Sequence, residues 1–562
     1  MLEDFIRRTK IAYFSMEIAL QPAIHTYAGG LGILAGDTMR SCSDLELPVV
    51  FVTLLSQDGY LKQVIDAEGR QTEEPDPWTP ARWAQPLGAK VAVEIGGREV
   101  WVRPWLYIHH GGPDYAVPVI LLDTDLDEND DADRAVTRVL YGGDQGHRLR
   151  QEIVLGIGGV RLLRALGFEI GTFHMNEGHA ALLALELLRT RRRPRNGNGG
   201  APSYDAEWVR ERCVFTTHTP VEAGHDRFPY DLVERVLTGF LDTADLAAFA
   251  GTDGLNMTRL GLALSGYVNG VAKRHAEISR RMYPGFRIHA ITNGVHVETW
   301  TCPSMAALFQ RCVPNWQHEP ELLVRADQLD DGELWAAHQA AKAALIAAVR
   351  EWSGCSLSID APVLGFARRM TGYKRPDLLF TDPDRLRRLA GRHPFQVLVA
   401  GKAHPDDDDG KRLIEAIHRH AAALADIVPV VFLPDYDMAM AKLLTAGCDV
   451  WLNTPLPPLE ASGTSGMKAA LNGVLNLSVL DGWWIEACID GTTGWAIGDA
   501  DLGTADDDAE ELYAALEQRV LPLYHGDRTR WAWMMKQSIS KIASCFNSQR
   551  MMRRYASEAY LR

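Results

Sequence analysis

Short runs of apolar, often β-branched residues alternate along this chain with longer stretches of helical periodicity. Six of these runs are continuous enough to be strands that are buried on both faces: 49–54, 213–217, 363–367, 396–400, 428–433 and 474–480. Buried strands that alternate with amphipathic helices are typical of parallel sheets covered by helices. The sequence therefore predicts an α/β fold.

Many of the predicted strands end in polar turns. The turns are rich in Gly, His, Asn, Lys or Arg, as in TTHTP, ARRMTGYKR, AGKAHPD and LPDYD. Ligands of open α/β sheets bind beyond the carboxyl ends of the strands. We therefore expect the chemistry of the protein in these turns.

The length of 562 residues is too great for one core and predicts two large domains. The sequence places their boundary near residues 300–314. A hydrophobic fraction of 46% and a charged fraction of 23% are those of an ordinary globular protein.

Composition and charge exclude several functions. No apolar stretch of about 18 residues predicts a membrane span, and a net charge of −15 argues against general nucleic-acid binding. The eight cysteines are scattered without a CxxC pair, which favours reduced thiols and a cytoplasmic location over a zinc site. The acidic runs 123–133 and 406–409 lack the glycine and glutamate of a calcium loop and read as exposed loops. No metal is therefore expected.

The stretch PLEASGTSGMKA, residues 458–469, places small residues directly before Lys468 and a predicted helix. Such a helix start exposes backbone N–H groups that suit a phosphate. A lysine in this position can form an imine with an aldehyde cofactor such as pyridoxal phosphate. Taken alone, a glycine-rich helix start with a surface lysine explains the stretch equally well.

A basic cluster follows the predicted strand 363–367. It brings Arg368, Arg369, Lys374 and Arg375 into one loop. Two neighbouring phosphates need about this much positive charge, and the strand-end position favours an anion site over a solvated charged face.

Glycines and polar turns in the first half complete the candidate chemistry. Gly29, Gly30 and Gly32 precede a helical pattern and offer a nest for an oxyanion. His218 follows an apolar strand, and Asn293 lies in an Asn-Gly turn. Each is individually compatible with a structural role, but together the turns favour a carbohydrate cleft.

The motifs EASGTSGMKAALNG, RRMTGYKR, TTHTP, ITNGVHVETW and AGGLGILAGD resemble those of the α-glucan phosphorylases. The resemblance is colinear from residue 13 to residue 488. The likeness is greatest to their short prokaryotic branch. It implies a glycosyltransferase-B architecture, in which two Rossmann-like domains face each other across a catalytic cleft and a C-terminal helix crosses back. The implied domains are 1–305, which binds glucan, 306–530, which binds pyridoxal phosphate, and 531–562, the helix that packs back on the N-terminal domain.

The resemblance also implies an activity. Orthophosphate would cleave the terminal α-1,4-linked glucose of glycogen, starch or maltodextrin reversibly and with retention, giving α-glucose 1-phosphate. The phosphate of pyridoxal 5'-phosphate would act as the acid and base, which explains why the sequence offers no carboxylate pair of the kind that retaining glycosidases use. Nucleic acid and membrane are not expected as partners, and a homo-oligomer such as a dimer is left open. Because the chain begins almost at its first strand, the regulatory N-terminal helices of longer members are not expected.

The residues that match the family's site follow from the same resemblance. Those assigned to the cofactor are Lys468, Gly463, Thr464, Ser465, Arg368, Tyr436 and Gly30. In the family, the backbone N–H of the glycine that matches Gly30 points at the phosphate pocket. Those assigned to the substrates are Arg369 and Lys374 for the phosphate and His218, Asn293, Glu460, Ala461, Ser462 and Gly463 for the glucose. Lys468, Arg369, Lys374 and His218 are the catalytic set. Arg368 replaces a lysine of well-known members, and Thr371 replaces a frequent histidine.

Two other functions use related features. A nucleotide-sugar-dependent α-glucan synthase would share the scaffold and the basic residues, but it has no need of a lysine in the SGTSGMK context. A catalytically silent glucan-binding protein has no need of Lys468, Arg369, Lys374 and His218 together. The phosphorylase interpretation explains both observations.

Overall fold

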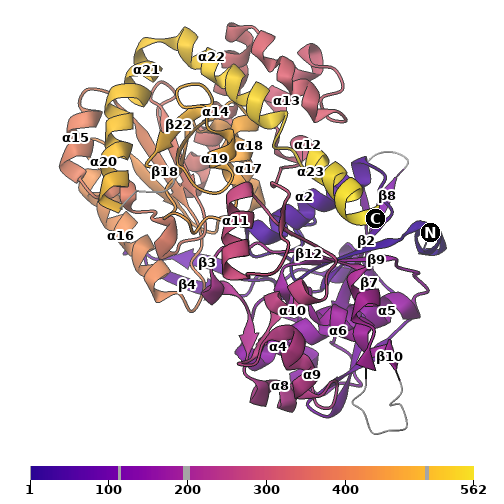
Figure 1. Ribbon diagram of the computed structural model, residues 1–562. Coiled ribbons are helices and arrows are strands. Elements are labelled where there is room, and N and C mark those ends of the chain that lie inside the picture. Colours follow the sequence, from indigo (N-terminus) through magenta and orange to yellow (C-terminus); the bar gives the residue numbers. More distant parts are fainter. Residues whose placement is uncertain (1, 112–114, 194–202, 500–504, 562) are drawn as a thin grey trace. The chain divides into compact units, whose positions relative to one another are not determined.

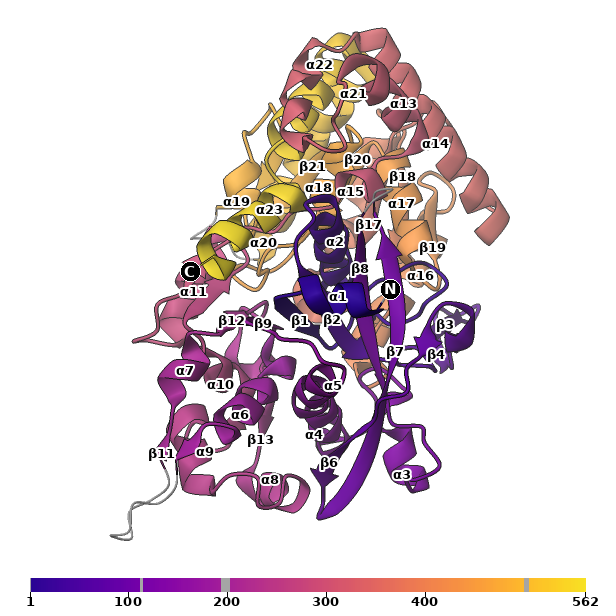
Figure 2. The same cartoon turned by 90° about the vertical axis from the view of Figure 1, so that its right-hand side faces the viewer.

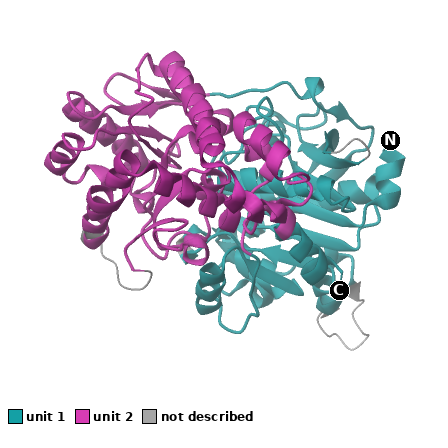
Figure 3. Ribbon diagram, turned by 90° about the horizontal axis from the view of Figure 1, so that it is seen from above, with its two compact units in different colours: residues 1–61, 75–291, 551–562 teal, residues 62–74, 292–550 magenta. Residues whose placement is uncertain are grey.

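The computed structural model describes residues 2–111, 115–193, 203–499 and 505–561. The chain divides into two compact units, shown in different colours in Figure 3. Unit 1 comprises residues 1–61, 75–291 and 551–562, and unit 2 comprises residues 62–74 and 292–550. The main crossing thus lies at 291/292, earlier than the sequence suggested, and a short segment of the first half belongs to unit 2.

Unit 1 is built on a ten-stranded sheet, whose central strands lie side by side in Figure 2. Seven neighbouring strands are parallel, in the order β16 (His289–Ala290), β15 (Tyr267–Gly270), β12 (Cys213–Thr216), β9 (Thr172–Asn176), β1 (Ile11–Ser15), β2 (Val49–Leu54), β8 (Ala116–Asp123). The antiparallel β7 (Arg98–His110) follows and pairs with β5 (Gln85–Pro86) and β6 (Val91–Ile95).

Helices pack around this sheet. They are α1 (Leu2–Arg8), α2 (Gly30–Asp44), α3 (Asp131–Arg134), α4 (Gln145–Ile153), α5 (Gly159–Ala165), α6 (Leu182–Arg189), α7 (Ala206–Arg210), α8 (Tyr230–Val236), α9 (Thr243–Ala250), α10 (Met257–Ala263) and α11 (Lys273–Met282). Two apolar clusters fill the unit, and β1 contributes Phe14 to one and Tyr13 to the other, as expected of a strand with both faces covered.

Unit 2 contains a six-stranded, fully parallel sheet (Figure 1). Its order is β19 (Val430–Leu433), β18 (Gln396–Ala400), β17 (Val363–Ala367), β20 (Val450–Asn453), β21 (Leu475–Val479), β22 (Gly494–Ile497). Its helices are α12 (Val297–Trp300), α13 (Pro303–Cys312), α14 (Asp331–Ser353), α15 (Pro383–Ala390), α16 (Asp408–Leu424), α17 (Met438–Gly447), α18 (Ser465–Leu471), α19 (Trp484–Ala487), α20 (Ala505–Ala515), α21 (Leu521–Gly526) and α22 (Arg528–Ser538).

The six predicted strands are all present in parallel ladders, so the α/β class is confirmed. Every residue of β17 and of β18 is buried, which is why both read as continuous apolar runs. The strand predicted from residue 428 begins at Val430, because Pro429 has no N–H to give to a ladder.

The C-terminal segment divides between the units. From residue 551 on, Met551, Met552 and Tyr555 of α23 (Ser548–Tyr555) are buried in an apolar cluster of unit 1. Earlier in the segment, α22 belongs to unit 2, where the ring centroid of Trp531 lies 5.8 Å from that of Trp495. The part that returns to unit 1 is therefore shorter than residues 531–562.

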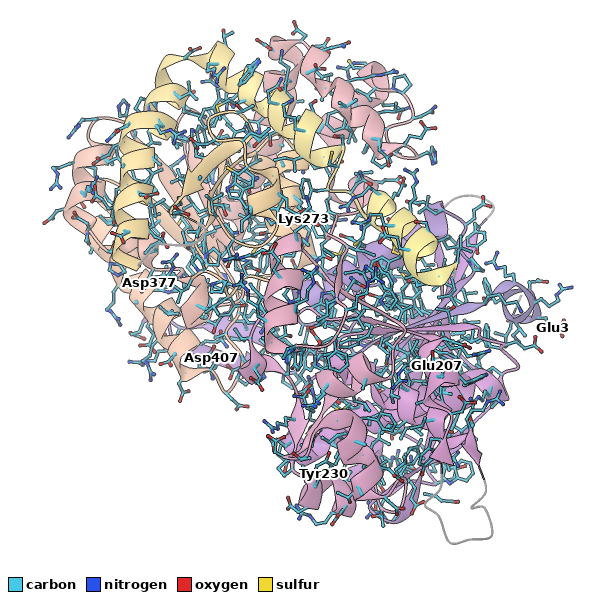
Figure 4. The ribbon with its side chains drawn as sticks, in the orientation of Figure 1. Glu3, Glu207, Tyr230, Lys273, Asp377 and Asp407 are labelled. Atoms are coloured by element: carbon cyan, nitrogen blue, oxygen red, sulfur yellow. The ribbon has the colours of Figure 1, made fainter. Side chains whose placement is uncertain are left out.

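The acidic run 406–409 is mostly a helix start, not a loop as the sequence suggested. Asp407, labelled in Figure 4, accepts a hydrogen bond of 2.8 Å from the backbone N–H of Gly410 and caps α16. Asp408 and Asp409 fill the first turn, where the helix dipole favours negative charge. None of the helices in the described ranges is long and apolar enough to cross a membrane.

Candidate active site

A pair of buried cations lies beyond the carboxyl end of β17. Arg368 and Lys374 are 9% and 7% exposed, and both form ion pairs with the carboxylate of Glu460. Burial alone would raise the pKa of Glu460, but these two cations hold it well below its usual value. Burial lowers the pKa of Lys374, and the charge of Arg368 adds to this effect. The site is thus a compact, desolvated cluster whose cations face one acceptor group.

The other two cations of this loop have different surroundings. Arg369 is exposed. Arg375 is buried with a positive φ of 47° and donates to the carbonyls of Thr454 and Pro455 at 2.8 Å each. Arg375 therefore fastens the loop to the end of β20, and the predicted group of four cations separates into a buried pair, an exposed arginine and a structural anchor.

One donor of the buried pair is unused. Nη1 of Arg368 is buried and has no hydrogen-bond partner among the described residues. Gly463 is adjacent: a Cβ added there would lie 3.8 Å from Nη2 of Arg368. Gly463 has a φ of +80°, which favours glycine. The loop after Glu460 therefore passes beside a guanidinium group with one N–H donor free to bind an additional anion.

Lys468 is also buried, at 6% exposure, on α18. Its Nζ lies 3.7 Å from the centroid of the Trp300 ring, a cation–π arrangement. A Cβ on Gly466 would come within 2.4 Å of Asn476 Oδ1 and 2.7 Å of Trp483, so α18 packs closely against its neighbours. The amine of Lys468 is thus desolvated and packed against Trp300, which argues against the interpretation as a surface lysine.

Asp481 lies beside the site, although the sequence pattern did not reveal it. It follows β21 and accepts hydrogen bonds from the backbone N–H groups of Glu460 and Gly482, each at 2.8 Å. Burial raises its pKa to about 6 despite these bonds. The one feature of the sequence that could have indicated Asp481 is an Asp-Gly pair directly after an apolar run. Asp481 fixes the segment in which Ala461 and Ser462 are both buried.

The remaining unit 2 residues occupy the ends of elements. Thr464 is the N-cap position of α18, and Ser465 begins that helix, where its Oγ accepts from Trp451 Nε1 at 3.0 Å. Tyr436 follows β19 and packs against the core. Asn293 is 5% exposed, and its Oδ1 has no partner within the described part of the chain.

In unit 1, a glutamate organises the glycine loop. Glu17 Oε2 accepts from the backbone N–H groups of Ala28 and Gly29 at 2.6 and 3.0 Å, and its Oε1 accepts from the Tyr141 hydroxyl at 2.9 Å. A Cβ on residue 32 would come within 2.6 Å of the Glu17 carboxylate, which requires Gly32. Gly30 is exposed, and nothing lies near an added Cβ. Glu17 thus holds the loop while the first residue of α2 faces open space.

His218 lies beyond the end of β12 in the same unit. Its Nε2 is 2.7 Å from the Asn176 amide oxygen, so this nitrogen carries the proton. Its backbone N–H donates to Glu177 Oε2 at 2.7 Å. Burial lowers the pKa of His218 to about 3, so the ring is neutral at physiological pH.

A carboxylate pair also exists in unit 1, although the sequence had not identified one. Arg148 reaches Glu152 at 3.3 Å and Asp226 at 3.2 Å, and it stacks 4.3 Å from the centroid of the Tyr141 ring. Glu152 is fully buried, and burial raises its pKa well above the usual value. A fully buried carboxyl beside an arginine supports the surrounding packing and does not face a substrate site.

The structure therefore brings Arg368, Lys374 and Glu460 together in unit 2. In unit 1 it places His218 after β12 and Gly30 at the start of α2. A parallel sheet with buried cations beyond one of its strand ends is typical of α/β proteins that bind anions there. The model of the carbohydrate phosphorylase family matches residues 242–490 of the chain.

Relatives that match almost the whole of this chain indicate the same family. Maltodextrin phosphorylase of Thermococcus litoralis is 37% identical, with 98% of this chain and 70% of the relative covered. Glycogen phosphorylase of Mycobacterium tuberculosis is 39% identical, with 98% and 71% covered. Glycogen phosphorylase of Aquifex aeolicus is 36% identical, with 98% and 86% covered. The chain belongs to the carbohydrate phosphorylase family.

Proposed function

We propose that this protein is an α-glucan phosphorylase, which transfers the terminal α-1,4-linked glucose of glycogen, starch or maltodextrin to orthophosphate. The relatives named maltodextrin and glycogen phosphorylase support the reaction class. The observation that carries the proposal is the convergence of Arg368 and Lys374 on the segment that leads to the buried Lys468. Two phosphates in contact repel strongly unless cations surround them, and this cluster supplies the cations.

The residues around Lys468 fit pyridoxal phosphate. The fit rests on the buried amine of Lys468, the unused Nη1 of Arg368 and the positive φ of Gly463 beside that arginine. When bound, this cofactor supplies a phosphate group that ionises near neutral pH and so suits proton exchange. Lys468 would anchor it. The residues that would hold its phosphate are Gly463, Thr464, Ser465 and Arg368, and Tyr436 would flank its ring.

The substrate phosphate would lie on Arg369 and Lys374, with the N–H of Gly30 directed at it. Orthophosphate would protonate the departing glycosidic oxygen and then capture the glucosyl carbon on the same face, which retains the α configuration. The residues proposed to hold the glucose are His218, Asn293, Glu460, Ala461 and Ser462. A neutral His218 can bond a sugar hydroxyl without adding a charge.

The family resemblance supports a glycosyltransferase-B arrangement, in which the two Rossmann-like units face one another across the catalytic cleft. Unit 1 would then supply most of the glucan contacts and unit 2 the cofactor site. The scattered cysteines without a CxxC pair favour a cytoplasmic enzyme.

Product analysis tests the proposal. Incubation with maltoheptaose and orthophosphate should give α-glucose 1-phosphate and a chain one glucose shorter. Lys374→Ala should lower kcat/KM by at least about 100-fold, because the loss of a charge-assisted contact at the reacting phosphate costs about 3 kcal/mol. Glucose transfer from UDP-glucose or ADP-glucose without any glucose 1-phosphate formation would instead identify a synthase.

A further inference from the structure

A hairpin from the first half of the chain is part of unit 2. Its strands β3 (Lys62–Ile65) and β4 (Gln71–Glu74) pair antiparallel, and the chain belongs to unit 1 up to Leu61 and again from Pro75. The hairpin carries two buried glutamines, Gln63 at 2% and Gln71 at 6% exposure. Buried amides are costly unless they are hydrogen-bonded, so their partners indicate what they do.

Gln63 holds the turn after β19. Its backbone N–H donates to Asp435 Oδ1 at 2.9 Å, and its Oε1 accepts from the backbone N–H of Asp435 at 2.8 Å. Its Nε2 donates to the carbonyl of Gly401 at 2.9 Å. Asp435 has a φ of 59°, so this reciprocal pair stabilises a backbone conformation that aspartate seldom adopts.

Gln71 holds the turn after β18. Its Nε2 donates to the carbonyl of Ala403, and its Oε1 accepts from the N–H of Ala403, both at 3.0 Å. The same Oε1 accepts from Gln63 Nε2 at 2.7 Å, which joins the two glutamines into one network. An ion pair of 2.9 Å between Lys411 and Glu73 adds a further contact to the hairpin.

Both turns border the site. Gly401 lies directly against the loop after β17: a Cβ there would be 1.8 Å from the carbonyl oxygen of Arg368, and Met370 N–H donates to Lys402 O at 3.0 Å. Asp435 immediately precedes Tyr436. The hairpin therefore braces the backbone beside Arg368 and the backbone that carries Tyr436.

We propose that Gln63 and Gln71 are positioning residues for the cofactor site: they hold the turns 401–403 and 435–436 in the conformation that places Arg368 and Tyr436. This inference rests on the proposed function, because those two residues are assigned there to pyridoxal phosphate. Neither glutamine touches the cofactor; each acts through the backbone of a turn.

Cofactor release measures this role without depending on turnover. Gln63→Ala and Gln71→Ala are loaded with pyridoxal phosphate and diluted into an excess of hydroxylamine, and the loss of the bound cofactor's absorbance is followed. Each variant removes two or more hydrogen bonds, so release should be about tenfold faster than in the wild type. Lys62→Ala is the matched control on the same hairpin, because Lys62 lies on its exposed side; its release rate should stay within twofold of the wild type.

A second readout separates positioning from general loss of structure. Hydrogen exchange in Gln63→Ala should rise in the peptides that cover residues 401–403 and 435–437, while β17 keeps its protection. If Gln63→Ala fails to fold, the release rate of Gln71→Ala alone tests the positioning role, because this variant keeps both hydrogen bonds between residues 63 and 435.

The two proposals fail in distinguishable ways. A wild-type protein that takes up no pyridoxal phosphate overturns the proposed function. A wild-type protein that binds it, with both glutamine variants releasing it as slowly as Lys62→Ala, overturns the positioning role alone.

Discussion

Glu460 neutralises two buried cations, so its removal should destabilise unit 2. Glu460→Ala leaves Arg368 and Lys374 desolvated without a counter-ion, which typically costs about 3–5 kcal/mol. Urea unfolding should show a lower midpoint. Millimolar orthophosphate should restore part of the loss, because an anion can occupy the place of the carboxylate and binds the folded state.

The exposed Glu74 gives the control for this substitution. Its partner Lys62 is about half exposed, so Glu74→Ala should leave the midpoint nearly unchanged. An unaltered midpoint in Glu460→Ala would show that the two cations are not buried against this carboxylate.

Tyr141 should control the glycine loop through Glu17. Tyr141→Phe removes the 2.9 Å hydrogen bond to Glu17 and keeps the ring that stacks on Arg148. Hydrogen exchange at the amides of Ala28 and Gly29 should become faster. If the lost hydrogen bond weakens phosphate binding by roughly 1.4 kcal/mol, kcat/KM should fall about tenfold.

Tyr115→Phe is the matched variant. It also loses a hydroxyl hydrogen bond in unit 1, to the carbonyl of Leu47, but it does not contact Glu17. Equal exchange rates for Ala28 and Gly29 in the two variants would contradict a role for Tyr141 in the loop.

Individual site residues differed in how well the sequence revealed them. Lys468 and Lys374 stand in short motifs whose local spacing is itself distinctive. Tyr141 and Glu17 are 124 positions apart, and their contact arises only when the loop before α4 meets the end of β1. Asp481 gave a weak local signal, since Asp-Gly is common in turns.

At the scale of strands and turns, the close approach of neighbouring turns fixes the position of the loop that carries Arg368. Gly401 follows β18 with a φ of +149°, and a Cβ there would collide with the Arg368 carbonyl. Gly401→Ala should therefore lower the free energy of unfolding by at least about 3 kcal/mol, from backbone strain and the displaced loop together, as measured by urea unfolding.

Gly391→Ala provides the comparison within the same unit. Gly391 has a φ of −65°, and an added Cβ would make ordinary contacts of 3.5 Å or more. It should be neutral or slightly stabilising. A Gly401→Ala variant as stable as Gly391→Ala would mean that the turn does not press on Arg368.

The six predicted strands could be found because each is buried over all or nearly all of its length and therefore forms an apolar run in the sequence. The hairpin 62–74 could not be found in this way. Its residues alternate between buried and exposed, so the pattern can suggest a hairpin, but it cannot tell which unit covers the buried side.

At the scale of the whole molecule, four desolvated, neutral histidines make unit 1 sensitive to acid. Burial lowers the pKa of His174, His179 and His218 to about 3 and that of His275 to about 4. Their stabilisation is complete above the unfolded pKa near 6.5 and is lost as the pH falls toward the folded values. Each adds a slope of up to about 1.4 kcal/mol per pH unit.

The melting temperature should therefore fall steadily from pH 7 to pH 5. His174→Gln should show a shallower dependence, because one of the four titrating groups is gone. A melting temperature that is constant over this range would contradict the lowered pKa of these rings.

Domain organisation was predictable in number but not in detail. Chain length and two sets of strands indicate two domains, whereas the crossings at 291/292 and 550/551 depend on contacts between distant segments. The cores of unit 1 show why: Met551 and Met552 join Tyr13 and Phe51 in one cluster, although nothing local in the sequence links them.

The proposed activity and the role of Lys468 are tested together by the time course of glucose 1-phosphate release from maltodextrin and orthophosphate, measured for the wild-type protein and for Lys468→Ala. We expect steady release by the wild type after loading with pyridoxal phosphate, and none by Lys468→Ala at an unchanged melting temperature of the unloaded protein. Wild-type turnover in Lys468→Ala without added pyridoxal phosphate, or no release by the loaded wild type, would contradict it.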